Sequence, residues 1–179
     1  MIAAVLMTAA IVLSELIARR LLSSRARALL VAYLFIASIA IVVAVPRGEG
    51  ELTLAALAGA LLAIVGYPAG RALLRDPTRA PSHDPLALEL AAFAFVALSE
   101  ELSWGAVVEP AISSPVTAAV FALKHPVVDG HWRRVLGLGL FWLGLGVVRG
   151  ESALLAAILH VALNVAAVVD GRIRGNDPF

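Results

Sequence analysis

Two adjacent glutamates, Glu100 and Glu101, lie within a strongly apolar stretch of the sequence, ALELAAFAFVALSEELSWGAVV. Two histidines lie in apolar stretches as well: His125 ends the segment FALKH, and His160 stands four residues before Asn164 in HVALN. Residues four apart share one face of an α-helix. Carboxylates and imidazoles are the usual proton acceptors and donors of hydrolytic enzymes, so these five residues are candidate catalytic groups.

These residue types suit two kinds of hydrolytic site. In the first, a glutamate accepts a proton from a water held by one histidine, while the second histidine and the asparagine amide donate hydrogen bonds to an oxyanion. In the second, Glu100, His125 and His160 hold a Zn²⁺ ion and leave one position for water. The sequence leaves both open. We favour no metal cofactor, because no carboxylate partner is evident for either histidine.

The elements that must position these groups are predicted to be membrane helices. The 179 residues are 61% hydrophobic and only 15% charged, with a mean hydropathy of +0.93. A soluble domain has about 25% charged residues. Cysteine is absent, which excludes thiolate chemistry. The glycines do not form a phosphate-binding loop, and no basic stripe with interleaved aromatics predicts a nucleic-acid partner.

Seven apolar runs predict an all-α, polytopic membrane bundle of about seven transmembrane helices, formed as a single domain over residues 1–179. A helix needs about 20 apolar residues to cross the hydrocarbon core, and the fifth and sixth runs are shorter than that. The predicted helices are Met1–Ala18, Ala28–Val45, Leu52–Ala69, Leu86–Val108, Pro115–Val128, Val135–Val148 and Ser152–Val169.

Basic residues alternate between the connections of this bundle, which predicts its orientation in the membrane. One set of connections holds Arg19, Arg20, Arg25, Arg27, Arg71, Arg75, Arg79, Lys124, Arg133, Arg134, Arg172 and Arg174. The other set holds only Arg47 and Arg149. We therefore expect a multi-pass protein of the cell membrane, with its N-terminus outside and its C-terminus in the cytoplasm.

Ionisable groups deep in a spanning helix cost a few kcal/mol, and for that reason they mark function. Counted from the predicted outer helix ends, Glu100, His125 and His160 lie eight, ten and eight residues inward, or about 12–15 Å. Three helices thus bring their deep ionisable groups to one level. A buried ion pair that holds helices together is the structural alternative. Glu15 stands four residues before Arg19 and is expected to snorkel beside it.

The segments EELSWG, FALKH and HVALN, in this order, resemble the motifs of the CPBP family of intramembrane proteases. Those motifs are E-E-x-x-x-R, F-x-x-x-H and H-x-x-x-[ND]. The family includes type II CAAX prenyl proteases and bacteriocin-processing or immunity proteins. The resemblance covers residues 86–169, the core that carries the protease-like motifs.

The resemblance implies an endopeptidase that cleaves a peptide or protein substrate in or near the lipid bilayer. It implies that Glu100 and His125 activate water, that His160 and Asn164 stabilise the oxyanion, and that Glu101 supports them. It also implies a hydrophobic cavity able to hold part of the substrate.

One position departs from the family pattern. The motif arginine is replaced by Gly105, so Glu101 is expected to lack a guanidinium partner. Two other functions stay open: a catalytically silent membrane-binding or immunity protein of the same family, and an ion-coupled transporter. Carboxylates and histidines also line ion pathways.

Overall fold

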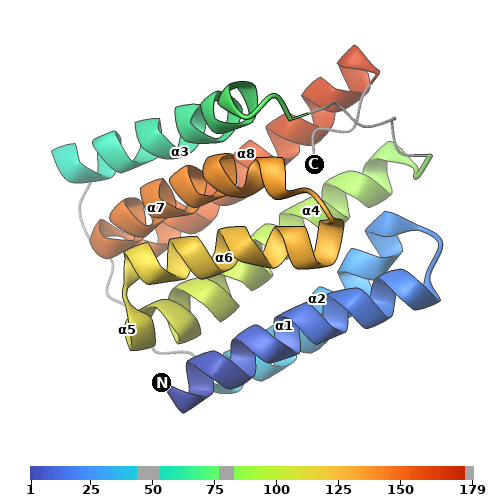
Figure 1. Ribbon diagram of the computed structural model, residues 1–179, viewed down its shortest axis with the longest axis horizontal. Coiled ribbons are helices and arrows are strands. Elements are labelled where there is room, and N and C mark those ends of the chain that lie inside the picture. Colours follow the sequence, from blue (N-terminus) through green and yellow to red (C-terminus); the bar gives the residue numbers. More distant parts are fainter. Residues whose placement is uncertain (44–52, 77–82, 176–179) are drawn as a thin grey trace.

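A computed structural model describes residues 1–43, 53–76 and 83–175, and within these ranges the chain is helical and has no strand (Figure 1). Predicted helix ends at Val45 and Leu52, and the connection residues Arg47 and Arg79, lie outside the described residues. The elements are α1 (Ile2–Leu21), α2 (Arg25–Val43), α3 (Leu54–Leu73), α4 (Leu86–Glu100), the π-helix η1 (Glu101–Val108), α5 (Glu109–Ile112), α6 (Ser114–Asp129), the 3₁₀ turn η2 (Trp132–Arg134), α7 (Val135–Glu151) and α8 (Ala153–Arg174).

Because α4, η1 and α5 follow one another without a break, the described residues form seven helical rods, one for each predicted apolar run. Several boundaries differ by a few residues: α1 ends at Leu21 instead of Ala18, α3 at Leu73 instead of Ala69, and α8 at Arg174 instead of Val169. The end of the fourth run differs as well. The helix predicted to stop at Val108 continues through Glu109 and Pro110 to a sharp turn at Ser113, whose φ is +80°. Pro115 then opens α6, a position that suits proline because the first helical N–H groups have no partner.

Four of the helices, α1, α2, α3 and α8, are long and apolar enough to cross a membrane. Large apolar side chains on their outer faces are exposed, among them Leu13, Leu61 and Ile158. The helices α4, α6 and α7 have 15, 16 and 17 residues, and α4 continues through η1 and α5. Much of their surface is covered by the other helices. An apolar exterior of this extent is typical of a surface that meets lipid.

The helix α7 lies between α3 and α6, while α1, α2, α4 and α8 complete the bundle (Figure 1). Its contact with α3 is unusually close. A Cβ added at Gly70 would lie 2.4 Å from the backbone nitrogen of Gly137, and one at Gly144 would lie 2.5 Å from that of Ala63. Small residues let two helix backbones approach in this way, and the contact fixes α7 against the bundle.

Candidate active site

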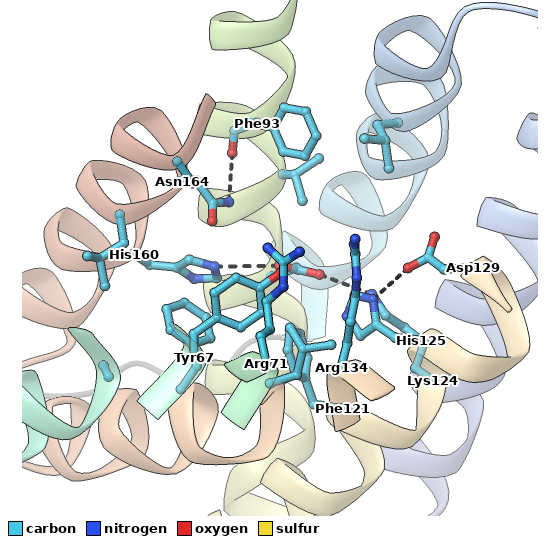
Figure 2. Close-up of a pocket in the computed structure, with 18 of the residues that line it drawn as sticks. Tyr67, Arg71, Phe93, Phe121, Lys124, His125, Asp129, Arg134, His160 and Asn164 are labelled. Atoms are coloured by element: carbon cyan, nitrogen blue, oxygen red, sulfur yellow. Dashed lines mark hydrogen bonds and ion pairs between the residues drawn. The ribbon is translucent and has the colours of Figure 1, made fainter. Parts of the chain in front are cut away.

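Four of the five predicted site residues line one cavity of about 380 Å³ (Figure 2). Glu100 comes from α4, His125 from α6, and His160 and Asn164 from α8. Glu101 is not part of the lining but contacts His160 from outside it. Much of the remaining wall is apolar and includes Leu29, Ala63, Val96, Leu138, Phe141 and Leu163. Many polar and charged side chains line the cavity as well, and beside the predicted residues they include Arg19, Arg25, Arg71, Asp129, Arg134 and Asp170.

The two glutamates lie where α4 passes into the π-helix η1. Pro110, just beyond this segment, has no N–H and cannot close an α-helical turn, and such gaps in the hydrogen-bond ladder distort helices. Glu100 and Glu101 are 5% and 9% exposed. π-Helical turns occur frequently at functional sites, and the sequence pattern alone predicted an uninterrupted α-helix here.

One oxygen of Glu100 belongs to a buried polar network. Its Oε1 accepts hydrogen bonds from the Tyr33 hydroxyl at 2.7 Å and from Lys124 Nζ at 3.0 Å. The same Nζ donates to Glu15 Oε1 at 2.8 Å. Glu15 is only 2% exposed, and the nearest Arg19 nitrogen is 3.7 Å away. Glu15 thus pairs with Arg19 as expected, but the prediction that it snorkels is wrong, because its carboxylate is buried and lies closer to the ammonium of Lys124.

The ring of His160 lies between the two adjacent glutamates. Its Nδ1 is 2.9 Å from Glu101 Oε1, and its Nε2 is 3.6 Å from Glu100 Oε2. A carboxylate only accepts hydrogen bonds, so Nδ1 is the donor and Nε2 faces Glu100. Phe141 and Trp142 pack edge-on against the imidazole, with ring centroids 5.0 and 5.8 Å away. These contacts hold the ring in a single orientation.

Glu101 has the guanidinium partner that the sequence was expected to lack. Arg149 of α7 donates from Nε at 2.8 Å and from Nη2 at 3.0 Å to the two oxygens of this carboxylate. Its Nη1 donates to Glu109. Arg149 was assigned to an outer connection, yet it is 3% exposed. Both expectations were wrong for one reason: the last turn of α7 packs against η1, where a Cβ at Gly105 would lie 2.5 Å from Arg149 Nε.

The second histidine also has a carboxylate partner. His125 Nδ1 lies 2.8 Å from Asp129 Oδ2, one turn further along α6, and Asp129 pairs with Arg19 at 2.8 Å. His125 Nε2 is buried and has no hydrogen-bond partner in the described part of the chain. The statement that neither histidine has a carboxylate partner is therefore wrong. The spacing of four between His125 and Asp129 was a readable signal for this pair.

Asn164 completes the polar part of the cavity. Its Nδ2 donates to the Phe93 carbonyl at 3.2 Å, which fixes the amide plane. An amide has two N–H donors, and this contact uses one of them. Asn164 therefore retains one donor for a group bound in the cavity (Figure 2).

Besides Asp129, the residues of the site that sequence reasoning missed include Tyr33, Lys124 and Arg149. Tyr33 lies in the middle of a long apolar run, where a buried hydroxyl needs a partner. Lys124 directly precedes His125 and was assigned to a connection, although it lies within α6 and is 3% exposed. No pattern in the sequence links Arg149 to Glu101, because the two are 48 residues apart.

The zinc alternative stays a prediction. Among the described residues, no three His, Asp or Glu side chains lie close enough together to hold a metal ion. A carboxylate on each Nδ1 is nevertheless the arrangement that orients metal-binding histidines. The metal-free expectation was based on the absence of such partners and loses that support, so it too stays a prediction.

Comparisons with family models, with curated proteins and with solved structures find no match for this chain. What the site can do is therefore inferred from its own groups. These are a buried carboxylate, two imidazoles with fixed Nδ1 partners and an amide donor, all reached from one apolar cavity.

Proposed function

We propose that this protein is an intramembrane endopeptidase that hydrolyses a peptide bond of a hydrophobic or membrane-associated substrate. One observation carries the proposal: Glu100 Oε2 lies 3.6 Å from His160 Nε2 at a cavity that His125 and Asn164 also line. The resemblance of the three motifs to those of CPBP proteases adds support. The mainly apolar lining suits an apolar segment of a peptide.

In the proposed reaction, Glu100 Oε2 takes a proton from a water molecule in the cavity, and the resulting hydroxide attacks the scissile carbonyl carbon. His125 Nε2 accepts the other hydrogen of this water and orients it. The oxyanion accepts a hydrogen bond from the free N–H of Asn164. Glu100 then returns its proton to the leaving amine, so that atoms and charges balance. Buried Lys124 stays on the other oxygen of Glu100, which leaves Oε2 as the reacting atom.

The role of His160 depends on its protonation state. Because Nδ1 donates to Glu101, Nε2 can donate to the oxyanion only in the doubly protonated ring. We assign that form to the reacting state: Nε2 takes one proton from solvent when substrate binds and returns it when the products leave, and in between His160 and Asn164 act together as the two oxyanion donors. Removing one such donor typically lowers kcat by about 10²–10³-fold.

We propose that all seven rods span the membrane, with the N-terminus outside. Burial of Lys124 and Arg134 removes two cations from the cytoplasmic side of the basic-residue pattern, and burial of Arg149 removes one from the outer side. Most basic residues still flank the cytoplasmic helix ends under this orientation, as the positive-inside rule requires. Helices of 15 to 17 residues are short for a full span, and α4 gains length from η1 and α5.

The test is peptide hydrolysis by the purified protein in micelles, with Glu100→Gln compared with Glu89→Gln. Glu89 is also a buried glutamate of α4, but it pairs with Arg172 and does not line the cavity. We expect Glu100→Gln to lose about 10²–10⁴-fold in rate, the usual contribution of a general base, and Glu89→Gln to stay near wild type. Equal losses in both variants would contradict the assignment. Activity that a chelator removes and Zn²⁺ restores would instead establish a metal site.

The transporter alternative is favoured by one specific observation, the continuous buried chain from Glu15 through Tyr33 and Lys124 to Glu100. Such chains of ionisable groups mark proton pathways in membranes. Proton flux into liposomes that contain the protein, abolished by Glu15→Gln, would support this function over hydrolysis. Binding of a hydrophobic peptide without turnover or flux would instead support the silent binding protein.

A further inference from the structure

The side chain of Arg149 contacts the site without entering it. Its guanidinium donates a hydrogen bond to each oxygen of Glu101, at 2.8 and 3.0 Å. It also lies over Trp142, with its central carbon 4.6 Å from the ring centroid. Arg149 does not line the cavity. Two contacts connect it to His160: Glu101, whose Oε1 accepts the Nδ1–H of that ring, and Trp142, which packs edge-on against it. Only the contact through Glu101 acts on the Nδ1 proton.

The geometry of this contact depends on a guanidinium rather than on a positive charge alone. A planar fork fixes both the position and the plane of a carboxylate, whereas an ammonium is a point charge that leaves the plane free. Arg149 Nη1 also donates to Glu109, so the fork is held at its far end as well. Because the plane of the Glu101 carboxylate is fixed, its Oε1 points at His160, and Nδ1 is the ring nitrogen that donates to it.

Space for this fork exists because residue 105 has no side chain. A Cβ at Gly105 would lie 2.5 Å from Nε, 3.0 Å from Cδ and 3.1 Å from Cζ of Arg149. These three atoms belong to the guanidinium group and its link to the side chain, and the buried residues around them leave the group little room to move. A methyl group at position 105 would push the guanidinium away from Glu101.

We propose that Arg149 is a positioning residue for His160. By clamping Glu101 across the gap at Gly105, it keeps the Nδ1–H tautomer of His160 and directs Nε2 toward Glu100 and the cavity. The catalytic meaning of this role rests on the proposed peptide hydrolysis, but the positioning itself is a property of the resting protein and can be measured without a substrate.

The measurement is the ¹⁵N spectrum of histidine-labelled protein in micelles, in which tautomers are distinguished by the shifts of the two ring nitrogens. Loss of one signal set in His160→Gln assigns that residue among the four histidines of the chain. We expect a single form protonated at Nδ1 in wild type and in the control Arg172→Lys, whose arginine binds the distant Glu89. Arg149→Lys should show a mixture of both tautomers.

Relocating the guanidinium gives a rescue test. In the double variant Gly105→Arg/Arg149→Gly, the arginine starts one turn after Glu101 and extends into the vacated space, so the single tautomer should return. If Arg149→Lys does not fold, Gly105→Ala replaces it, since that variant keeps every polar group and displaces only the fork. A wild-type tautomer of His160 in the foldable variant would overturn the proposal.

Activity provides a separate readout. Changes to groups that orient a catalytic or ligand histidine typically cost about 10–100-fold. We expect Arg149→Lys to lower kcat by this factor and to leave KM unchanged, because the cavity lining is intact. If wild type hydrolyses no peptide, the proposed function fails, while the tautomer result still decides whether Arg149 positions His160.

Discussion

Replacing Lys124 by Met should be among the most damaging single changes in this protein. Its Nζ lies 2.8 Å from Glu15 Oε1 and 3.0 Å from Glu100 Oε1, and all three side chains are buried. Removing one partner of a buried ion pair costs about 3–5 kcal/mol of unfolding free energy, because the remaining charge has no compensation. Here two carboxylates lose their shared cation. We therefore expect the loss to lie at the upper end of that range.

A second change should return part of this loss. Glu15→Gln alone leaves one buried ion pair and an amide that still accepts a hydrogen bond, so it should cost about 1 kcal/mol. In the Lys124→Met background the same change removes an unpaired carboxylate and should be stabilising, which gives a coupling energy of about 1–3 kcal/mol. Equilibrium unfolding in mixed micelles, followed by tryptophan fluorescence, measures all four proteins of the cycle.

The control is Arg174→Met, which removes a mostly exposed cation that pairs with Asp170. Surface changes of this kind usually stay within about 0.5 kcal/mol. If Lys124→Met is as stable as Arg174→Met, the buried network does not contribute as described. Equal effects of Glu15→Gln in both backgrounds would refute the coupling.

Three further predictions concern packing, strain and orientation. Gly70→Ala should lower the unfolding free energy by about 1–3 kcal/mol in the same assay, because its Cβ would lie 2.4 Å from a backbone nitrogen of α7. Its control is Gly150→Ala, whose Cβ would have no atom within 4 Å and which should raise the unfolding free energy by about 0.5–1 kcal/mol. Ser113→Gly should raise stability by about 1 kcal/mol, since φ of +80° with ψ of 155° suits glycine alone; an unchanged unfolding midpoint would show that this turn carries no strain. The chain has no cysteine, so single cysteines can be introduced as labelling sites. Cysteines at Arg27 and Arg174 should react with an impermeant maleimide only from the cytoplasmic side, and one at Ser113 only from outside. Labelling of all three from one side would reject the orientation.

The helical rods and four cavity residues follow from local patterns in the sequence. Apolar runs of about 20 residues are bounded by arginines and prolines, so most helix boundaries can be read to within a few residues. The polar groups inside these runs are few, and a bundle of this size has one interior to receive them. Glu100, His125, His160 and Asn164 were therefore identifiable because of their surroundings as much as their spacing.

The partners of these residues could not be read in the same way. Lys124 and Glu15 are 109 residues apart and meet because α1 packs beside α6 and η1, which depends on the arrangement of all the helices. Arg149 looks like a loop residue when its charge alone is considered. Its burial becomes intelligible only when Glu101 and Glu109 are known to face the same space. Local hydropathy contains no information on such long-range charge pairing.

The π-helical segment also makes the chain tolerant of a change in its own length. A π-turn closes hydrogen bonds one residue further along than an α-turn, so η1 holds more residues in its turns than an α-helix of equal rise. Deleting one residue from a regular α-helix rotates everything beyond it by about 100°. Removing a single residue between Glu101 and Glu109, such as Ala106, would instead remove a residue that the π-turns absorb, so the regular ladder would re-form and the helix beyond it would turn by much less. Single-residue deletions in this segment should thus be tolerated better than deletions within α4, which makes η1 the part of this rod where the length of the chain can vary.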